Sequence, residues 1–68
     1  MNRFEAIAQL TVKRGGMVSR EKVEVEIDDE TYRLSTFPAG REKLKAWAMS
    51  LFPGADSVAV DNIVRANR

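Results

Sequence analysis

The sequence predicts a small α+β domain in two layers, with the element order α-β-β-α-β and a β-hairpin sheet packed against two helices. Two observations predict this class. Apolar residues recur at helical spacing over 3–14 and 38–52, and between these segments they alternate with polar residues as in strands. The 68 residues suffice for one domain at most, so we expect a single globular unit over 1–68 with a frayed tail at 65–68.

Residues 3–14 admit two interpretations, of which a helix is preferred. Asn2 suits a helix N-cap, and Phe4 and Ile7 share one helical face. The pair Gly15-Gly16 would then end the helix. The alternative is a strand, because apolar residues also fall on every second position: Phe4, Ala6, Ala8, Leu10 and Val12.

Residues 22–37 predict a β-hairpin. Val25 and Ile27 alternate with charged residues, and a turn centred on residues 29–30 would pair Ile27 with Tyr32. The turn lacks an Asn-Gly or Asp-Gly pair, so a four-residue loop is as good an interpretation as a two-residue one.

Residues 38–52 predict the second helix. Pro38 suits the first helical turn, and Pro53-Gly54 supplies a stop. The apolar stripe of this helix includes Trp47 and Leu51, and we expect Trp47 at the centre of the core.

Residues 57–64 predict a short strand, because Ser57 to Val60 is β-branched and apolar at alternate positions. Asp61-Asn62 would form a turn or a bulge in it. The alternative is a final helix capped by Asp56.

The composition argues against an enzyme. The chain has no histidine and no cysteine, which removes the usual acid–base and thiol groups and the common zinc sites. It also has no glycine-rich phosphate loop, and a substrate pocket is hard to fit beside so small a core. We therefore expect no catalytic residue, no cofactor and no small-molecule substrate.

The sequence carries no apolar run approaching the roughly 20 residues of a membrane span. Its N-terminal stretch, residues 1–5, contains an acid and no long apolar segment, unlike a secretory signal. We expect no membrane partner and a cytoplasmic location.

Charge is unevenly distributed along the chain, although the net charge is only +1. Residues 21–30 hold six acids against Lys22, a net charge of −5. Residues 1–20 and residues 31–52 each hold four basic residues against one acid, a net charge of +3. The sequence therefore predicts a molecule with an acidic side and a basic side.

The acidic segment is the predicted site of protein binding. Its spacing matches no EF-hand loop, so we expect no metal there. An acidic hairpin with an open edge strand can add to a partner's sheet, and the partner is another protein or a second copy of the chain. An inhibitor or regulator of a larger complex, of the type that mobile elements carry, is one such role. The candidate residues are Glu24, Glu26, Asp28, Asp29 and Glu30.

The alternative function is nucleic-acid binding through a basic patch. Lysine and arginine side chains would neutralise phosphates, and binding would weaken steeply with salt. The near-zero net charge argues against it. The candidate residues are Arg14, Arg20, Arg41, Lys43 and Lys45.

Overall fold

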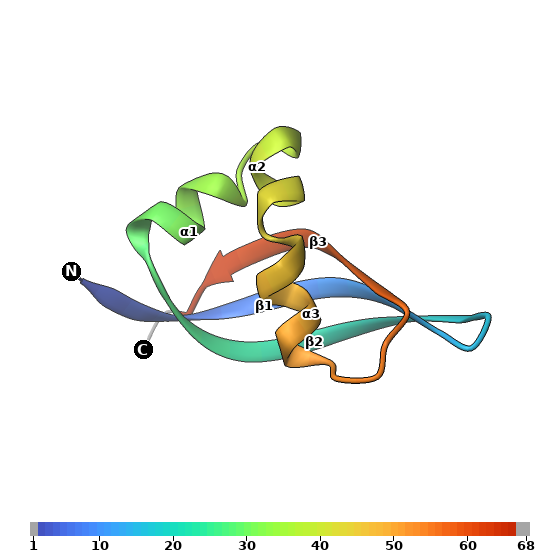
Figure 1. Cartoon of the computed structure of the whole chain (residues 1–68). Helices are drawn as coiled ribbons and strands as arrows, with labels where there is room; N and C mark the ends of the chain where they lie inside the picture. Colours follow the sequence, from blue (N-terminus) through green and yellow to red (C-terminus); the bar gives the residue numbers. More distant parts are fainter. Residues whose placement is uncertain (1, 67–68) are drawn as a thin grey trace.

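The computed structural model describes residues 2–66. In these residues two long strands come first, three short helices follow, and a third strand ends the chain (Figure 1). The elements are β1 (Arg3–Arg14), β2 (Met17–Asp28), α1 (Asp29–Leu34), α2 (Pro38–Lys43), α3 (Lys45–Leu51) and β3 (Ser57–Arg65).

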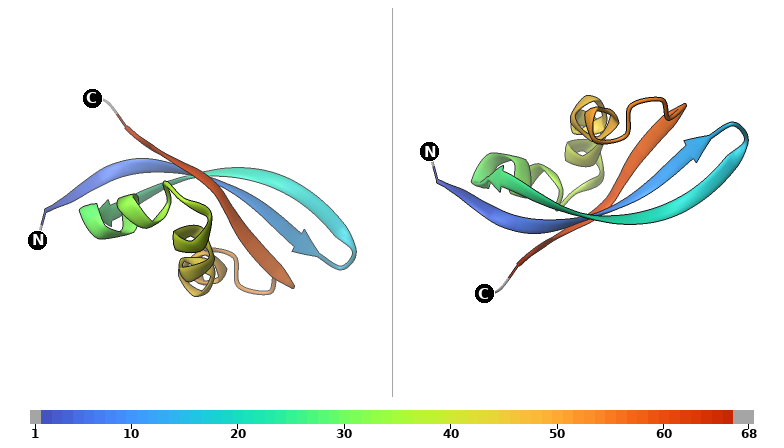
Figure 2. Two further views of the ribbon diagram at one scale, coloured as in Figure 1. Left: turned by 90° about the horizontal axis from the view of Figure 1, so that it is seen from above. Right: turned by 90° about the horizontal axis from the view of Figure 1, so that it is seen from below.

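The three strands form one antiparallel sheet in the order β2-β1-β3, so β1 lies in the centre. The helices pack on one face of this sheet, and Figure 2 shows the opposite face without a covering element. The predicted α+β class and the two-layer arrangement are confirmed. The order of the elements is β-β-α-α-α-β and not the predicted α-β-β-α-β.

The preferred helical interpretation of residues 3–14 is wrong, and the strand alternative is the one that forms. Burial alternates along β1, with Ala6, Ala8, Leu10 and Val12 all buried beneath the helices. The helical and strand patterns of this segment are similarly strong, and pairing decides between them. As the central strand, β1 makes backbone hydrogen bonds on both of its edges, which a helix at this position could not do.

Gly15 and Gly16 form the turn of a β-hairpin and do not cap a helix. Arg14 pairs directly with Met17, which leaves only the two glycines in the loop. Their φ angles are 56° and 81°, and positive φ at both central residues is the requirement of a type I′ turn. The Gly-Gly pair between two alternating runs is therefore a hairpin signal.

The predicted hairpin over residues 22–37 is also corrected. Its first half is part of β2, which pairs with β1, so that Ile27 lies opposite Phe4 and not opposite Tyr32. Its second half is α1. The Asp28 carboxylate accepts a hydrogen bond from the Thr31 N–H at 2.8 Å and caps this helix. Acidic residues in the first turn suit the helix dipole and favour a helix over a strand.

The predicted helix over 38–52 forms as two short helices. Pro38 lies in the first turn of α2, as expected. Leu44 separates α2 from α3, with φ −88° and ψ 2°, and its buried side chain lies against the core. α3 ends at Leu51, since Phe52 precedes Pro53 and has left the helical conformation, and Gly54 then turns the chain with a φ of 93°.

The predicted last strand is confirmed as β3, and of the two interpretations of Asp61-Asn62, a turn or a bulge, the bulge forms. Gln9 pairs with Asn62 and Leu10 with Val60, so Asp61 is the extra residue. Of the expected frayed tail, residues 65 and 66 are ordered, because Arg65 ends β3 and the Ala66 N–H donates to the Glu5 carbonyl at 3.0 Å. Residues 67–68 of that tail lie outside the described part of the chain.

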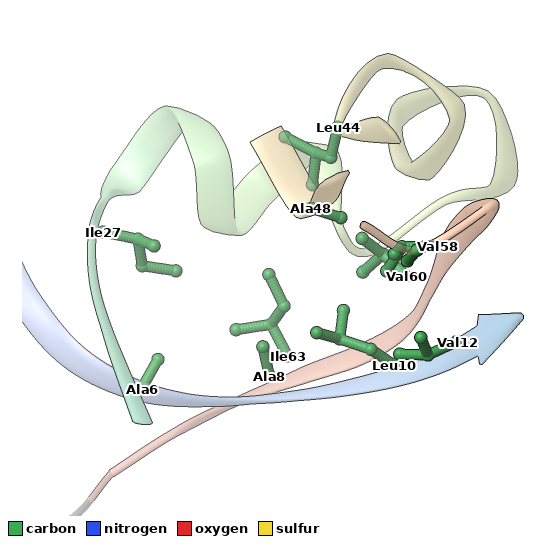
Figure 3. Close-up of a cluster of buried hydrophobic side chains, with 11 residues drawn as sticks. Ala6, Ala8, Leu10, Val12, Ile27, Leu44, Ala48, Val58, Val60 and Ile63 are labelled. Atoms are coloured by element: carbon green, nitrogen blue, oxygen red, sulfur yellow. The ribbon is translucent and has the colours of Figure 1, made fainter. Parts of the chain in front are cut away.

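The core lies between the helices and the inner face of the sheet (Figure 3). Leu10 and Val58 are the largest fully buried side chains, and both come from strands. Trp47, expected at the centre, is half-buried and packs against this cluster. The buried apolar residues are Ala6, Ala8, Leu10, Val12, Ile27, Leu44, Ala48, Ala55, Val58, Val60 and Ile63.

Candidate protein-interaction surface

The strand β2 forms one edge of the sheet over twelve residues. Its partner on one side is β1, and no strand among residues 2–66 pairs with its other side. Register with β1 is unbroken from Arg14–Met17 to Arg3–Asp28, so β2 has no bulge in that pairing. It also contains no proline. An edge strand of this kind presents a row of backbone donors and acceptors to a partner.

The two faces of β2 differ in chemistry. On the inner face, under the helices, Val23 and Val25 are half-buried and Ile27 is buried. The outer face carries only charged side chains over four consecutive outward positions, and all four residues are exposed. These are Arg20, Lys22, Glu24 and Glu26.

The five predicted acidic residues follow one another from the sheet onto the first helix. Glu24 and Glu26 are exposed on the outer face of β2, where alternation placed them. Asp29 and Glu30 are exposed in the first turn of α1, and not in a hairpin turn. Asp28 lies at the junction, where the hydrogen bond from the Thr31 N–H lowers the pKa of its carboxyl.

The structure adds Glu5 to this acidic surface. Glu5 lies directly opposite Glu26 on β1 and is exposed. The helical interpretation of residues 3–14 does not predict that Glu5 lies next to Glu26. The strand alternative places Glu5 among the outward-facing positions. Arg3 contacts Glu26 at this end of the sheet, with Nε 3.2 Å from Glu26 Oε1 and Nη2 2.9 Å from the Glu26 carbonyl oxygen.

The basic residues of the alternative hypothesis are divided between two regions. Arg14 and Arg20 are exposed on β1 and β2 near the turn of the hairpin. The other three lie on the helices, which Figure 1 shows away from that turn. Arg41 Nη1 donates to the Ser35 carbonyl at 3.0 Å, and Lys45 lies 3.8 Å from Glu42. Lys43 is exposed on α2. The five therefore do not form one patch.

A shallow hollow of about 430 Å³ lies among the three strands. Its lining carries both signs of charge, from Arg20 and Lys22 on β2 and Asp61 in β3. The Thr11 hydroxyl donates to Asp61 at 2.6 Å, which fixes that carboxylate in the bulge. Within residues 2–66 no three acidic side chains come together in a group that could hold a metal ion.

Comparison of the chain with protein-family models, with curated proteins and with solved structures found no match. In the part of the chain that the structure describes, no helix combines the length and the apolar character that a bilayer crossing requires.

Proposed function

We propose that this chain is a small, non-enzymatic protein-binding module whose contact surface is the open edge of β2 with the acidic residues Glu24 and Glu26. The observation that carries the proposal is the twelve-residue edge strand, which has neither proline nor bulge and is exposed on its charged face. A partner strand added to this edge would gain main-chain hydrogen bonds, and side-chain pairs would supply specificity.

The acidic residues that continue from β2 into α1 extend this surface. Asp29 and Glu30 lie next to the end of the strand and are exposed, so a partner with basic side chains there would meet a complementary potential. When the partner strand belongs to a larger complex, β2 would occupy the edge of that strand. The module would then act as an inhibitor or regulator of the complex. A cytoplasmic location of this role is part of the proposal.

The test is affinity capture from a lysate, with and without nuclease, followed by mass spectrometry and titration of the protein recovered. We expect Glu24→Lys plus Glu26→Lys to weaken binding at least tenfold, because two attractive positions become repulsive. The control is Glu42→Lys, which reverses an exposed charge on α2, outside this surface. Unchanged affinity of the β2 variant would contradict the proposal.

A second candidate function is nucleic-acid binding by the hairpin. The observation that favours it is the group of exposed cations beside the turn, Lys13, Arg14 and Arg20. Fluorescence anisotropy with a labelled duplex, measured between about 50 and 300 mM salt, tests it. Phosphate contacts by these side chains would give a steep fall of affinity with salt, and a flat response would exclude this function.

A further inference from the structure

The charges on the outer face of β2 follow a specific order. Reading along the strand, the outward positions are Arg20, Lys22, Glu24 and Glu26, which gives two positive charges followed by two negative charges. A strand with this order is complementary to itself when a second copy runs in the opposite direction. The order is centred on Val23, next to the midpoint of the strand Met17–Asp28.

We infer that the partner of the β2 edge is a second copy of this chain, paired antiparallel about a two-fold axis at Val23. This inference rests on the proposed function and names its partner. Lys22 then lies opposite Glu24 of the second copy, and Arg20 opposite Glu26 of the second copy. The symmetry repeats both pairs, so four opposite-charge pairs cross the interface.

Neighbouring registers are less favourable. An axis at Lys22 would place this lysine opposite Lys22 of the second copy. An axis at Glu24 would place two Glu24 carboxylates opposite each other. Like charges directly opposite destabilise a strand pair. An axis between two residues would place the charged face of one β2 beside the apolar face of the other, because side chains alternate along a strand. Only the axis at Val23 places each of these four charges opposite a charge of the other sign.

The inner face is compatible with the same register. Val23 meets Val23 of the second copy, so two half-buried valines would lose exposed surface. Val25 lies opposite Glu21 of the second copy, whose side-chain methylenes would cover it. The helices of both copies lie on the same face, and the product is one six-stranded antiparallel sheet.

The two edges of the monomer sheet differ in a way that favours pairing at β2. At the other edge, the bulge at Asp61 interrupts β3, which is one of the devices that discourage edge-to-edge association. β2 has no such interruption. Charged side chains on an edge strand usually prevent association because they repel a second copy of the strand. The order of charges on β2 instead attracts a second copy in one register. Arg20 and Lys22 lie opposite Thr11 and Gln9 on β1, which carry no charge. Glu26 lies 3.2 Å from Arg3 of its own chain, and its carboxylate would be shared with Arg20 of the second copy.

Cysteine cross-linking tests the register directly, since the chain contains no cysteine. In Val23→Cys the two Cα atoms would be about 4.5–5.5 Å apart, within the range of a disulfide. In the control Val25→Cys the two positions are four residues out of register, roughly 13 Å apart along the strands. We expect a disulfide-linked dimer from Val23→Cys alone. Equal cross-linking of both variants, or of neither, would overturn the register.

Charge exchange tests the pairing in solution by sedimentation equilibrium. The pair Glu24→Lys/Glu26→Lys makes the outer face of β2 wholly positive, and Arg20→Glu/Lys22→Glu makes it wholly negative. We expect each variant to weaken the dimer about 100-fold or more, because four attractive pairs become repulsive. An equimolar mixture should recover a heterodimer, which also shows that both variants fold.

The outcomes separate this inference from the function on which it rests. A wild-type protein that is monomeric at about 100 μM would overturn the self-pairing. If the binding of a captured protein still required Glu24 and Glu26, the protein-binding function would stand, with that protein as the partner. Variants that dimerise as tightly as the wild type would overturn the inference, because the charges would not define the contact.

Discussion

At the residue scale, the tightest backbone approach among the glycines is at Gly40 in α2. A Cβ on this residue would lie 2.7 Å from the Leu34 carbonyl carbon and closer still to its oxygen. The obstacle is backbone at the end of α1, which cannot rotate away as a flexible side chain can. Gly40 therefore allows α2 to pack against α1, and the reason for a glycine here is close approach, since its φ is not positive.

We expect Gly40→Ala to destabilise the protein by about 1–3 kcal/mol, the usual cost of overpacking. Helix propensity alone predicts the opposite effect, a rise in the free energy of unfolding of up to about 1 kcal/mol. Urea unfolding followed by circular dichroism measures the difference. Ala39→Gly, at the exposed neighbouring position, is the control. Stabilisation by Gly40→Ala would show that α1 and α2 do not pack as described.

Asp28 joins strand and helix by accepting a hydrogen bond from the Thr31 N–H, and its protonation should affect stability. Its pKa is lowered in the folded protein, first by the Thr31 backbone N–H, then by the Thr31 hydroxyl, with a smaller contribution from Arg3. A lowered folded-state pKa means that this stabilisation is present above the unfolded pKa of about 4 and is lost as the pH falls through the folded pKa.

We expect the melting temperature of the wild type to fall between pH 5 and pH 3 more than that of Asp28→Asn. Asparagine can still cap the helix but does not titrate in this range. Thermal unfolding at several pH values measures this. Asp29→Asn, a neighbouring acid in the same helical turn, is the control. Parallel pH curves for wild type and Asp28→Asn would contradict the role of the Asp28 carboxylate.

At the element scale, the hairpin β1–β2 depends on its two-residue turn. The Gly15 N–H donates to the Asp56 carboxylate at 2.8 Å, so the turn is also fastened to the segment that leads into β3. No atom lies within 4 Å of a Cβ built on either glycine. The demand for glycine therefore comes from the positive φ angles alone.

Replacing Gly15-Gly16 by Ala-Ala should cost about 2–4 kcal/mol, roughly 1–2 kcal/mol for each residue forced into the left-handed region. Asn-Gly, the preferred pair of a type I′ turn, should remain close to the wild type and serves as the control. Chemical denaturation of the three proteins is the measurement. Equal stability of Ala-Ala and wild type would contradict the turn geometry.

Part of the candidate surface could be predicted from the elements. The alternation of Val23, Val25 and Ile27 with charged residues placed Glu24 and Glu26 on an outward face, and the structure agrees. The partner strand could not be predicted. Local pattern pairs Ile27 equally well with Tyr32 or with Phe4, and the Asp28 cap that turns residues 29–34 into a helix decides for Phe4.

At the scale of the whole molecule, three strands and three short helices leave one sheet face and one long edge without a covering element among the described residues (Figure 2). A chain of this size buries a small core and has no disulfide. Association through β2 would add buried surface and hydrogen bonds to that core. The stability of the fold and its self-association should then be linked.

We expect the melting temperature to rise by about 5 °C or more when the concentration increases about 100-fold, because a dimer is favoured by mass action. Scanning calorimetry or circular dichroism at several concentrations measures this. Arg20→Glu/Lys22→Glu, expected to be monomeric, is the control and should melt at one temperature throughout. A constant melting temperature for the wild type would argue against the self-paired sheet.

The sequence by itself determined those features whose signal is local. Pro38 and Pro53-Gly54 bounded the helical region, and β-branched residues marked β3, with a turn or a bulge expected at Asp61-Asn62. The periodicity of the apolar residues predicted the α+β class. The order of charges on β2 is likewise a property of the sequence. Each of these depends on residues within a few positions of one another.

Only the tertiary structure decided that residues 3–14 form the central strand, that Glu5 joins the acidic surface, and that the five basic residues lie in two regions. The physical reason is that a strand obtains its hydrogen bonds and much of its burial from partners distant in sequence. For β1 these partners include β3, some fifty residues away. An apolar pattern that suits both helix and strand cannot reveal how many neighbours the segment will have.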